Sequence, residues 1–485
     1  MRHKRIDRRG FIQKAGAGAF LARSVANSEF PVFHAAELGY AAEQGGEWCE
    51  KMLNGDFARL ITLDPAHFHA ALIQKEMGKG ISPRVAVFAP LGPDLLSHLN
   101  LIEQFNLRAT NPTHWELDVH CTPRSLEEML AARPGNVVVL AGHNQSKINK
   151  IKASLEAGLN VLADKPWIIR AEDLPQLEAA LALAEQKGLV ACDIMTERRE
   201  ITTILQRELV TDPDVCGPLV ALGHVNPGVE MESTHHIFKA VNGAPNPRPP
   251  FFFDIRDQGE GLTDVGTHLV DLVQWTLFPN QALDYRQDIH VQGGKRWPTP
   301  ISLNQFKQIT GEQGFSPELA AYVHGDVFDY VCNSQLDYQL RGVQVRLRVL
   351  WNWESPAGVD FHHAIYRGTR ASVEVRQTIK ENYRPEVFVA PNGAEHRAAI
   401  AAAVSARLER LQNVFPGISS ESMRDEVHIT IPDRYRVGHE AHFAQVVAEF
   451  LKYLQAPQSM PAWERSNMLA KYFTTTMGAQ MSAST

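Results

Sequence analysis

The stretch NVVVLAGHNQSKINKIKASLEAGLNVLADKP (residues 136–166) begins and ends with short apolar runs and has a helical pattern between them. The middle run, SKINKIKASLEAG, ends on a glycine, as the C-termini of helices commonly do. Two short apolar runs joined through one helix are typical of parallel strands with a crossover connection. This stretch therefore predicts a strand-helix-strand unit.

The same alternation continues on both sides of this unit. Helical runs such as AHFHAALIQKEM (66–77) separate strand-like runs at 57–63, 84–90, 115–120, 136–142, 160–166 and 189–195. Strands and helices in this order predict an α/β fold with a doubly wound parallel sheet. In such sheets a ligand binds beyond the carboxyl ends of the strands, where the strand order reverses.

The pattern changes after about residue 198. Long alternating runs, of which SQLDYQLRGVQVRLRVLWNWES (334–355) is the clearest, indicate antiparallel strands with one solvated face. We expect a second, mostly antiparallel α+β domain with an open sheet, and a proline-rich loop without regular structure at 242–254 near the site. The predicted organisation is a signal peptide at 1–26, a linker at 27–55, the α/β domain at 56–197, the α+β substrate and oligomerisation domain at 198–440, and C-terminal helices at 441–485 that pack back on both domains.

The composition excludes several classes of protein. Of the 485 residues 44% are hydrophobic and 21% charged, as in globular proteins, and the net charge of −7 gives no general attraction to nucleic acid. No apolar run approaches the roughly 20 residues of a membrane span. The five cysteines form no C-x-x-C pair, so we expect neither a disulfide framework nor a metal site. The predicted partner is a small molecule, and exposed strand faces suggest a homo-oligomer.

The N-terminal stretch DRRGFIQKAGAGAFLARSVANS (7–28) has adjacent Arg8 and Arg9, followed by a weakly apolar segment and small residues. It resembles a twin-arginine export signal, with cleavage expected after Ala26. This resemblance implies a periplasmic or secreted protein that folds before export. A basic N-terminus of a cytoplasmic protein is the alternative.

Two stretches carry candidate catalytic residues. Lys165 stands at the carboxyl end of the fifth strand-like run, directly before Pro166, and faces the expected crevice. GLTDVGTHLVDLVQW (261–275) is an apolar helix on which Asp264, His268 and Asp271 share one face. These three are either satisfied core residues or residues with a chemical role.

DKP after the fifth strand, followed by D-x-G-x-H-x-x-D at 264–271, resembles the glucose-fructose oxidoreductase / inositol dehydrogenase / MocA family, whose signatures are E-K-P and D-x-G-x-H. The resemblance implies a Rossmann-like domain that binds NAD or NADP, and a sugar or polyol between the two domains. It also implies that Lys165 and His268 are catalytic, with Asp264 supporting them. Alcohol oxidation needs a base, here His268, and a cation for the developing alkoxide, here Lys165. Asp264 would hold the imidazole or bind a sugar hydroxyl.

The turn after the first strand departs from this family. LDPAHFHAA (63–71) has no glycine, whereas dinucleotide-binding turns usually read G-x-G-x-x-G so that backbone can approach the pyrophosphate. Histidine side chains could replace the missing backbone donors. The candidate cofactor-binding residues are Asp64, His67, His69, Asn144, Lys165 and Pro166. The choice between NAD and NADP stays open.

Candidate substrate-binding residues follow the sixth strand and precede the proline-rich segment. They are Glu197, Arg198, His235 and His236, together with Asp264 and His268. Arg198 could instead form an ion pair at the domain junction. The adjacent histidines, expected in a loop, have no third ligand at a defined spacing, so we expect no metal there.

Three functions are consistent with this pattern. The first is a nicotinamide-dependent oxidoreductase that acts on a hydroxyl of a sugar, glycoside or polyol. Its cofactor would be tightly bound because free NAD(P) is scarce outside the cytoplasm. The second is redox-neutral cleavage of a glycoside by oxidation and elimination. The third is a non-enzymatic carbohydrate-binding protein that has lost the cofactor.

Overall fold

The computed structural model describes residues 57–220, 225–241, 244–245, 247–355 and 358–483. The predicted signal peptide at 1–26 and linker at 27–55 lie outside these residues. The first sheet is parallel and has the order β3-β2-β1-β4-β5-β6, the doubly wound arrangement predicted from the sequence. Its strands are β1 (Leu60–Leu63), β2 (Arg84–Ala89), β3 (Glu116–Cys121), β4 (Val137–Leu140), β5 (Asn160–Ala163) and β6 (Ala191–Asp193).

Helices cover both faces of this sheet. They include α3 (Pro93–Leu107), α4 (Ser125–Ala132), α5 (Lys147–Glu156) and α6 (Leu174–Lys187). Successive residues of a strand face opposite sides, so Val137 and Val139 join one hydrophobic core while Val138 and Leu140 join the other. Burial on both faces explains why these strands are continuous apolar runs.

One crossover helix differs from the prediction. The helix expected at 66–77 is confined to α2 (His69–Leu72), because the side chains of Trp115 and Arg108 take the carbonyls of the residues that follow it. The core on this face is completed by α12 (His439–Gln455), which contributes Phe443 and Phe450 among others. A helix from the C-terminal part of the chain thus completes the N-terminal sheet.

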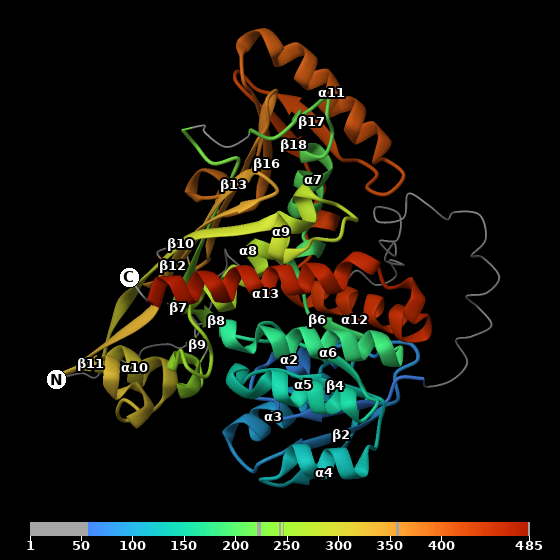
Figure 1. Cartoon of the computed structure of the whole chain (residues 1–485), viewed down its shortest axis with the longest axis vertical. Helices are drawn as coiled ribbons and strands as arrows, with labels where there is room; N and C mark the ends of the chain where they lie inside the picture. Colours follow the sequence, from blue (N-terminus) through green and yellow to red (C-terminus); the bar gives the residue numbers. More distant parts are fainter. Residues whose placement is uncertain (1–56, 221–224, 242–243, 246, 356–357, 484–485) are drawn as a thin grey trace, which may run out of the picture. The chain divides into compact units, whose positions relative to one another are not determined.

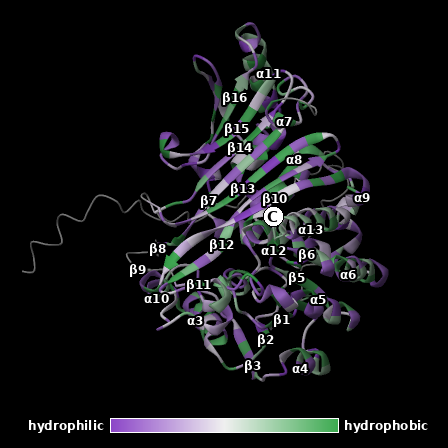
Figure 2. Ribbon diagram, turned by 60° about the vertical axis from the view of Figure 1, so that its left-hand side comes forward, coloured by the Kyte–Doolittle hydropathy of each residue, from purple (hydrophilic) through white to green (hydrophobic). Residues whose placement is uncertain are grey.

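The second sheet is mostly antiparallel, as predicted, with the order β10-β12-β13-β7-β14-β15-β16-β18-β17 and β11 beside β12. Its strands are β7 (Val229–Phe238), β10 (Ile289–Ser302), β11 (Val323–His324), β12 (Val327–Leu340), β13 (Val343–Glu354), β14 (Phe361–Arg367), β15 (Ala371–Gln377), β16 (Glu386–Pro391), β17 (Ser419–Ser422) and β18 (Val427–Thr430). Hydrophilic and hydrophobic residues alternate along these strands (Figure 2). The proline-rich segment 242–254 contains β9 (Ala244–Pro245), which pairs with β8 (Ala240–Val241) just before the segment, and a 3-10 turn (Pro250–Phe253). We had expected no regular structure in this segment.

Two helices connect the sheets. The remaining helices are α7 (Ile201–Val210), α8 (Gly261–Leu277), α9 (Tyr285–Asp288), α10 (Leu303–Thr310), α11 (Arg397–Arg410) and α13 (Ala462–Ala483). Helix α13 contacts β10 and α8 on one side and α6 on the other, so it lies between the two sheets (Figure 1). Helix α8 packs on β12 and β13. A side chain at Gly261 would lie 2.0 Å from the carbonyl oxygen of Cys332, so only glycine permits α8 to begin this close to β12.

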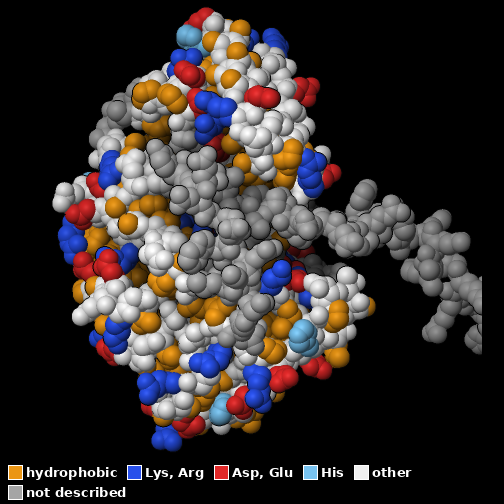
Figure 3. All heavy atoms as spheres, turned by 90° about the vertical axis from the view of Figure 1, so that its right-hand side faces the viewer, with side chains coloured by type: hydrophobic (Ala, Val, Ile, Leu, Met, Phe, Trp, Pro, Cys, Tyr) orange, Lys and Arg blue, Asp and Glu red, His pale blue; other side chains and the backbone are white. Residues whose placement is uncertain are grey.

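Figure 3 shows how side chains of different kinds are distributed on one face of the molecule. Acidic, basic and hydrophobic side chains are interspersed on that face, without a continuous field of one charge (Figure 3). Among the described residues, no helix has both the length and the apolar character that crossing a membrane requires.

Candidate active site

The carboxyl ends of the parallel strands meet at one edge of the first sheet. The strand order reverses between β1 and β4, because the chain runs outward from β1 to β3 and then returns to β4. Asp64 directly follows β1, Asn144 lies in the loop after β4, and Lys165 and Glu197 follow β5 and β6. The reversal point of a doubly wound sheet is where ligands bind.

Lys165 joins this edge to α8. Its Nζ donates to the carboxylate of Asp264 and, at 3.1 Å, to the backbone carbonyl of the same residue. Both side chains are largely buried, and the peptide bond between Lys165 and Pro166 is cis. Burial by itself would raise the pKa of Asp264, but the nearby Lys165 charge outweighs it and holds this pKa at about 2. Asp264 is therefore ionised at neutral pH.

His268 lies one turn further along α8. Its Nδ1 is buried and has no hydrogen-bond partner within the described part of the chain. Burial, reinforced by the positive charge of Lys165, lowers the pKa of His268 well below its ordinary value. The imidazole is thus neutral at physiological pH, the form that can accept a proton. Asp264 binds Lys165 and not this imidazole, so one of its two expected roles is not seen.

The glycine-free turn after β1 is closed by the loop after β4. The backbone amides of Ala66 and His67 both donate to the carbonyl of Ala141, at 3.0 and 3.2 Å. A side chain at Gly142, where φ is +93°, would lie 2.8 Å from Cβ of Ala66. Backbone amides that a glycine-rich turn would offer to a pyrophosphate are therefore already used within the protein.

Several polar side chains lie beside the closed turn after β1. Asp164, between β5 and Lys165, accepts hydrogen bonds from the buried Lys147 through its carboxylate and its carbonyl. The Nδ1 atoms of His67 and His69 each lie 3.3 Å from Oδ2 of Asp164. Both histidines, proposed from the sequence as cofactor contacts, thus face a buried carboxylate.

Asp64 and Asn144 border the same turn. One carboxylate oxygen of Asp64 pairs with Lys150 at 2.7 Å, and Nδ2 of Asn144 donates to the carbonyl of Gln258 at 2.7 Å. Oδ1 of Asp64 and Oδ1 of Asn144 are buried and have no partner in the described residues. Two hydrogen-bond acceptors at the reversal point are therefore left for a donor that the chain does not supply.

Unpartnered polar atoms are also found at this edge of the sheet. Buried side-chain atoms there without a hydrogen bond to any described residue are Asp64 Oδ1, His67 Nδ1, His69 Nδ1, Asn144 Oδ1 and His268 Nδ1. Buried polar atoms in folded proteins are nearly always hydrogen-bonded, so each exception needs an explanation. Several exceptions in one place indicate a ligand site.

Glu197 and Arg198, both predicted to bind substrate, have different surroundings in the structure. Glu197 borders the site, and burial together with the charge of Glu200 raises its pKa to about 7. The guanidinium group of Arg198 is buried and donates to Asp271 and Glu464, so it forms the domain-junction ion pair that was its alternative. We correct its assignment as a substrate contact, because these carboxylates take its Nε and both Nη atoms.

His235 and His236 lie in strand β7 and not in a loop as expected. Their Nδ1 atoms face the two oxygens of Asp360 at 3.1 and 3.2 Å. His236 is fully buried, whereas His235 is partly exposed. Adjacent strand residues point to opposite faces, so only His235 keeps an exposed surface for a ligand.

Sequence reasoning missed three residues of the site. Asp164 adjoins Lys165 in DKP, and Lys147 follows the candidate residue Asn144 by three positions, so both signals were present. His439 gave no signal because it begins α12, far away in the sequence. Its ring centroid lies 5.8 Å from that of His69, and burial together with Lys165 lowers its pKa to about 4.

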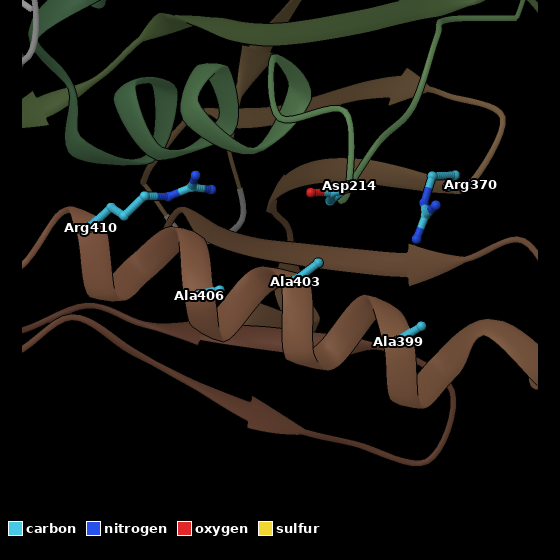
Figure 4. Close-up of a pocket in the computed structure, with 6 residues that line it drawn as sticks. All are labelled: Asp214, Arg370, Ala399, Ala403, Ala406 and Arg410. Carbon is cyan, nitrogen blue, oxygen red and sulfur yellow. The ribbon is translucent and has the colours of Figure 1, made fainter.

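A separate hollow lies under α11 (Figure 4). Its lining consists of Ala399, Ala403 and Ala406 of the helix, with Asp214, Arg370 and Arg410 around them. Arg410 is paired with Asp212. Among its lining residues only Asp214 could act as an acid, base or metal ligand, so the hollow does not compete with the edge of the parallel sheet as a catalytic site.

Fold and site define a two-sheet protein with a polar ligand site at the carboxyl ends of a doubly wound parallel sheet. The family model described as "Putative oxidoreductase C terminal domain" matches residues 205–483, more than half of the chain, and the chain belongs to this family. The resemblance predicted from DKP and D-x-G-x-H is thereby confirmed as an oxidoreductase family of the glucose-fructose oxidoreductase / inositol dehydrogenase / MocA type. None of the curated proteins matches the sequence.

Solved structures agree with this membership. A protein from Parabacteroides merdae ATCC 43184, described as a "putative oxidoreductase", is 44% identical, with 88% of this chain and 98% of that chain covered and a TM-score of 0.86. KijD10, a 3-ketoreductase from Actinomadura kijaniata in complex with NADP, is 12% identical over 87% of this chain and 97% of its own, with a TM-score of 0.52. A "putative myo-inositol dehydrogenase" from Sinorhizobium meliloti is 11% identical over 88% and 98%, also with a TM-score of 0.52. The last two share the fold alone.

Proposed function

We propose that this oxidoreductase transfers a hydride between NAD or NADP and a hydroxyl-bearing carbon of a sugar, glycoside or polyol. The observation that carries the proposal is the convergence of Lys165, Asp264 and a neutral His268 at the carboxyl ends of the parallel strands. Unpartnered buried polar atoms surround them. The NADP complex of KijD10 and the inositol dehydrogenase fold support the cofactor and the substrate class.

The residues at the reversal point fit a dinucleotide. Asp64 Oδ1 and Asn144 Oδ1 are buried acceptors without partners in the described residues, and the hydroxyl and amide groups of a nicotinamide nucleotide are donors. We propose that Asp64, Asn144, Lys165 and Pro166 hold the cofactor. When bound, its nicotinamide ring supplies or accepts the hydride. The closed turn after β1 means that side chains contribute more to binding than the backbone does.

His268 and Lys165 perform the proton chemistry in this proposal. The neutral imidazole accepts the proton of the substrate hydroxyl, and the Lys165 ammonium group stabilises the negative charge that develops on that oxygen. Asp264 fixes Lys165 through its carboxylate and its carbonyl. Burial lowers the pKa of His268 enough to keep it unprotonated at neutral pH.

The substrate is proposed to extend from His268 toward Glu197 and His235. Glu197 has a pKa near 7, so it can donate or accept a hydrogen bond, or a proton, around neutral pH. His235 is partly exposed on β7. Groups that both donate and accept suit the hydroxyls of a carbohydrate.

The first test is direct detection of the cofactor. Denaturing the freshly purified protein and analysing the supernatant by mass spectrometry should release a near-stoichiometric amount of NAD(H) or NADP(H). That result would also decide between the two dinucleotides. No dinucleotide, together with no binding on titration, would contradict the proposal and favour a carbohydrate-binding protein.

Product analysis separates the two enzymatic alternatives. With a panel of sugars and glycosides, net oxidation yields a keto sugar and a stoichiometric amount of reduced cofactor or second product. Redox-neutral cleavage yields a released aglycone without net cofactor reduction. Because the cofactor requirement is the same, only the product distinguishes them.

We also propose export to the periplasm by the twin-arginine route, supported by Arg8 and Arg9 in the N-terminal stretch. The test is fractionation of cells that produce the full chain. Changing both arginines to lysine should retain the protein in the cytoplasm. Equal periplasmic amounts for the two forms would contradict this route.

A further inference from the structure

His67, His69 and Asp164 bring three potential metal-ligand atoms together outside the Lys165–His268 pair. The histidines come from the turn after β1 and the first residue of α2, and Asp164 directly follows β5. Their ligand atoms lie within 4.8 Å of one another. Each Nδ1 is 3.3 Å from the same carboxylate oxygen, Oδ2 of Asp164, and the imidazole planes are nearly perpendicular, at 84°.

Neither contact has the geometry of a well-formed hydrogen bond. Both Nδ1 atoms are buried and meet the geometry of a hydrogen bond with no atom of the described residues, although the carboxylate is so close. Metal ligands sit about 2.0–2.2 Å from zinc, so two ligands of one tetrahedral ion are separated by roughly 3.4 Å. The two separations of 3.3 Å between an imidazole nitrogen and the carboxylate oxygen are close to this value.

Neighbouring groups hold the three side chains in this arrangement. The buried ammonium group of Lys147 binds Oδ1 and the carbonyl of Asp164, which leaves Oδ2 turned toward the histidines. The ring of His69 packs on Phe443 of α12, with centroids 4.8 Å apart. Metal sites commonly have their ligands oriented by such outer contacts.

We propose that His67, His69 and Asp164 bind a divalent transition-metal ion, for which zinc is the suitable probe. Two imidazole nitrogens and one carboxylate oxygen suit zinc and iron and leave coordination positions open. His67 is partly exposed, so the open side can reach solvent or a bound molecule. The proposed metal site replaces the expectation that the protein has no metal site. It also gives both histidines a role other than contact with the dinucleotide.

The ion would border the proposed catalytic group. His67 is near enough to Asp264 to act on it electrostatically, and Asp264 binds Lys165. A cation on His67 would therefore add positive charge beside Lys165. That charge would stabilise negatively charged oxygens of a cofactor or substrate at this edge of the sheet.

The test uses the full-length protein without an affinity tag, first for its metal content and then, after treatment with a chelator, for Zn²⁺ binding by titration calorimetry. We expect close to one equivalent per chain. His67→Gln and His69→Gln should each weaken Zn²⁺ binding by at least about 10-fold, the loss that even an outer contact causes when removed. The matched control is His120→Gln, which changes an exposed histidine on β3 and should leave binding unchanged.

Circular dichroism would verify that the variants fold, and Asp164→Asn would remove the third ligand without a change in size. A protein that binds no Zn²⁺, or that binds it equally in the His67, His69 and His120 variants, would overturn the proposal. Detection of the dinucleotide is a separate measurement. A protein with dinucleotide and without metal keeps the proposed function and loses only the metal site.

Discussion

Helix α8 carries two clusters of polar side chains, and the clusters differ in how completely they are hydrogen-bonded. Asp264 and His268 occupy its first turns, and Asp271 follows one turn later. The carboxylate of Asp271 accepts two hydrogen bonds of 2.6 Å from Arg198 and one of 2.9 Å from Lys471. His268, in contrast, leaves a buried ring nitrogen without a partner in the described chain.

The group around Asp271 is completed by further partners from other elements. Lys471 of α13 also pairs with Asp193 at the end of β6, at 2.8 Å, and Asp193 accepts a hydrogen bond from the Tyr472 hydroxyl. Burial by itself would raise the pKa of Asp271, but Arg198 and Lys471 hold it well below its ordinary value. This group connects α8, α13 and the first sheet, and every charge in it is compensated.

The difference separates residues that support the fold from those available for chemistry. The cluster of Asp264 and His268 and the cluster around Asp271 are both buried and both contain charged side chains. Burial and charge alone therefore do not identify a catalytic site. What distinguishes the front of α8 is incomplete hydrogen bonding at the edge where a ligand is expected.

The largest effect is expected at the front of α8. His268→Gln removes the proposed base and should lower kcat by about 10²- to 10⁴-fold, with little change in the free energy of unfolding. Steady-state kinetics with a substrate from the sugar panel, alongside urea unfolding, would measure both. A variant with undiminished kcat would remove His268 from the proposed mechanism.

A large stability effect is expected one turn later. Asp271→Ala leaves Arg198 and Lys471 as buried charges without their shared partner, which typically costs about 3–5 kcal/mol. Urea unfolding of this variant beside Asp264→Ala would show the contrast, since Asp264 lies at the ligand site and pairs with one cation. Equal destabilisation by the two changes would mean that the two groups do not differ as described.

Acid should destabilise the protein through its buried histidines before it affects the carboxylates. His98, His439 and His442 have pKa values lowered to about 4, each mainly by burial. The unfolded chain, with histidine pKa values near 6.5, binds more protons between about pH 6.5 and 4. The free energy of unfolding should therefore fall as pH decreases through this window.

Asp264, with a pKa of about 2, contributes stability that is lost only below about pH 4. Urea unfolding at a series of pH values measures the slope, and His98→Leu should flatten it, because His98 is buried with neither ring nitrogen hydrogen-bonded to the described residues. A slope that the His98→Leu variant leaves unchanged would contradict the assignment of His98 as a neutral buried histidine.

The smallest effect is expected for an exposed ion pair. Arg286 donates to both carboxylate oxygens of Glu178 at 2.9 Å, and both side chains are exposed to solvent. Arg286→Ala should change the free energy of unfolding little, because water screens such pairs. A loss as large as that of Asp271→Ala would show that ion pairing, and not its burial, determines the stability contribution.

Much of the fold could be predicted from short patterns. The continuous apolar runs at 137–140 and 160–163 indicated buried parallel strands, and the alternating run at 334–355 indicated a half-exposed antiparallel pair. Lys165 was placed correctly at a strand end because Pro166 marks the turn. These inferences succeed since strand and helix periodicity are local properties of the chain.

Local patterns were misleading where distant residues intervene. The run 66–77 has a helical pattern, but contacts from Trp115 and Arg108 end α2 after four residues. Arg198 was a plausible substrate contact until folding placed it between Asp271 and Glu464. In both cases a long-range hydrogen bond decided the outcome.

By itself the sequence determined the two kinds of sheet, the family and the catalytic candidates on β5 and α8, because each rests on adjacent residues. Only the tertiary structure decided which buried charges are compensated and which are left for a ligand. It also brought His439 of α12 beside His69, and Lys147 onto Asp164. Such pairings depend on how separate elements pack, and no periodicity within one segment encodes them.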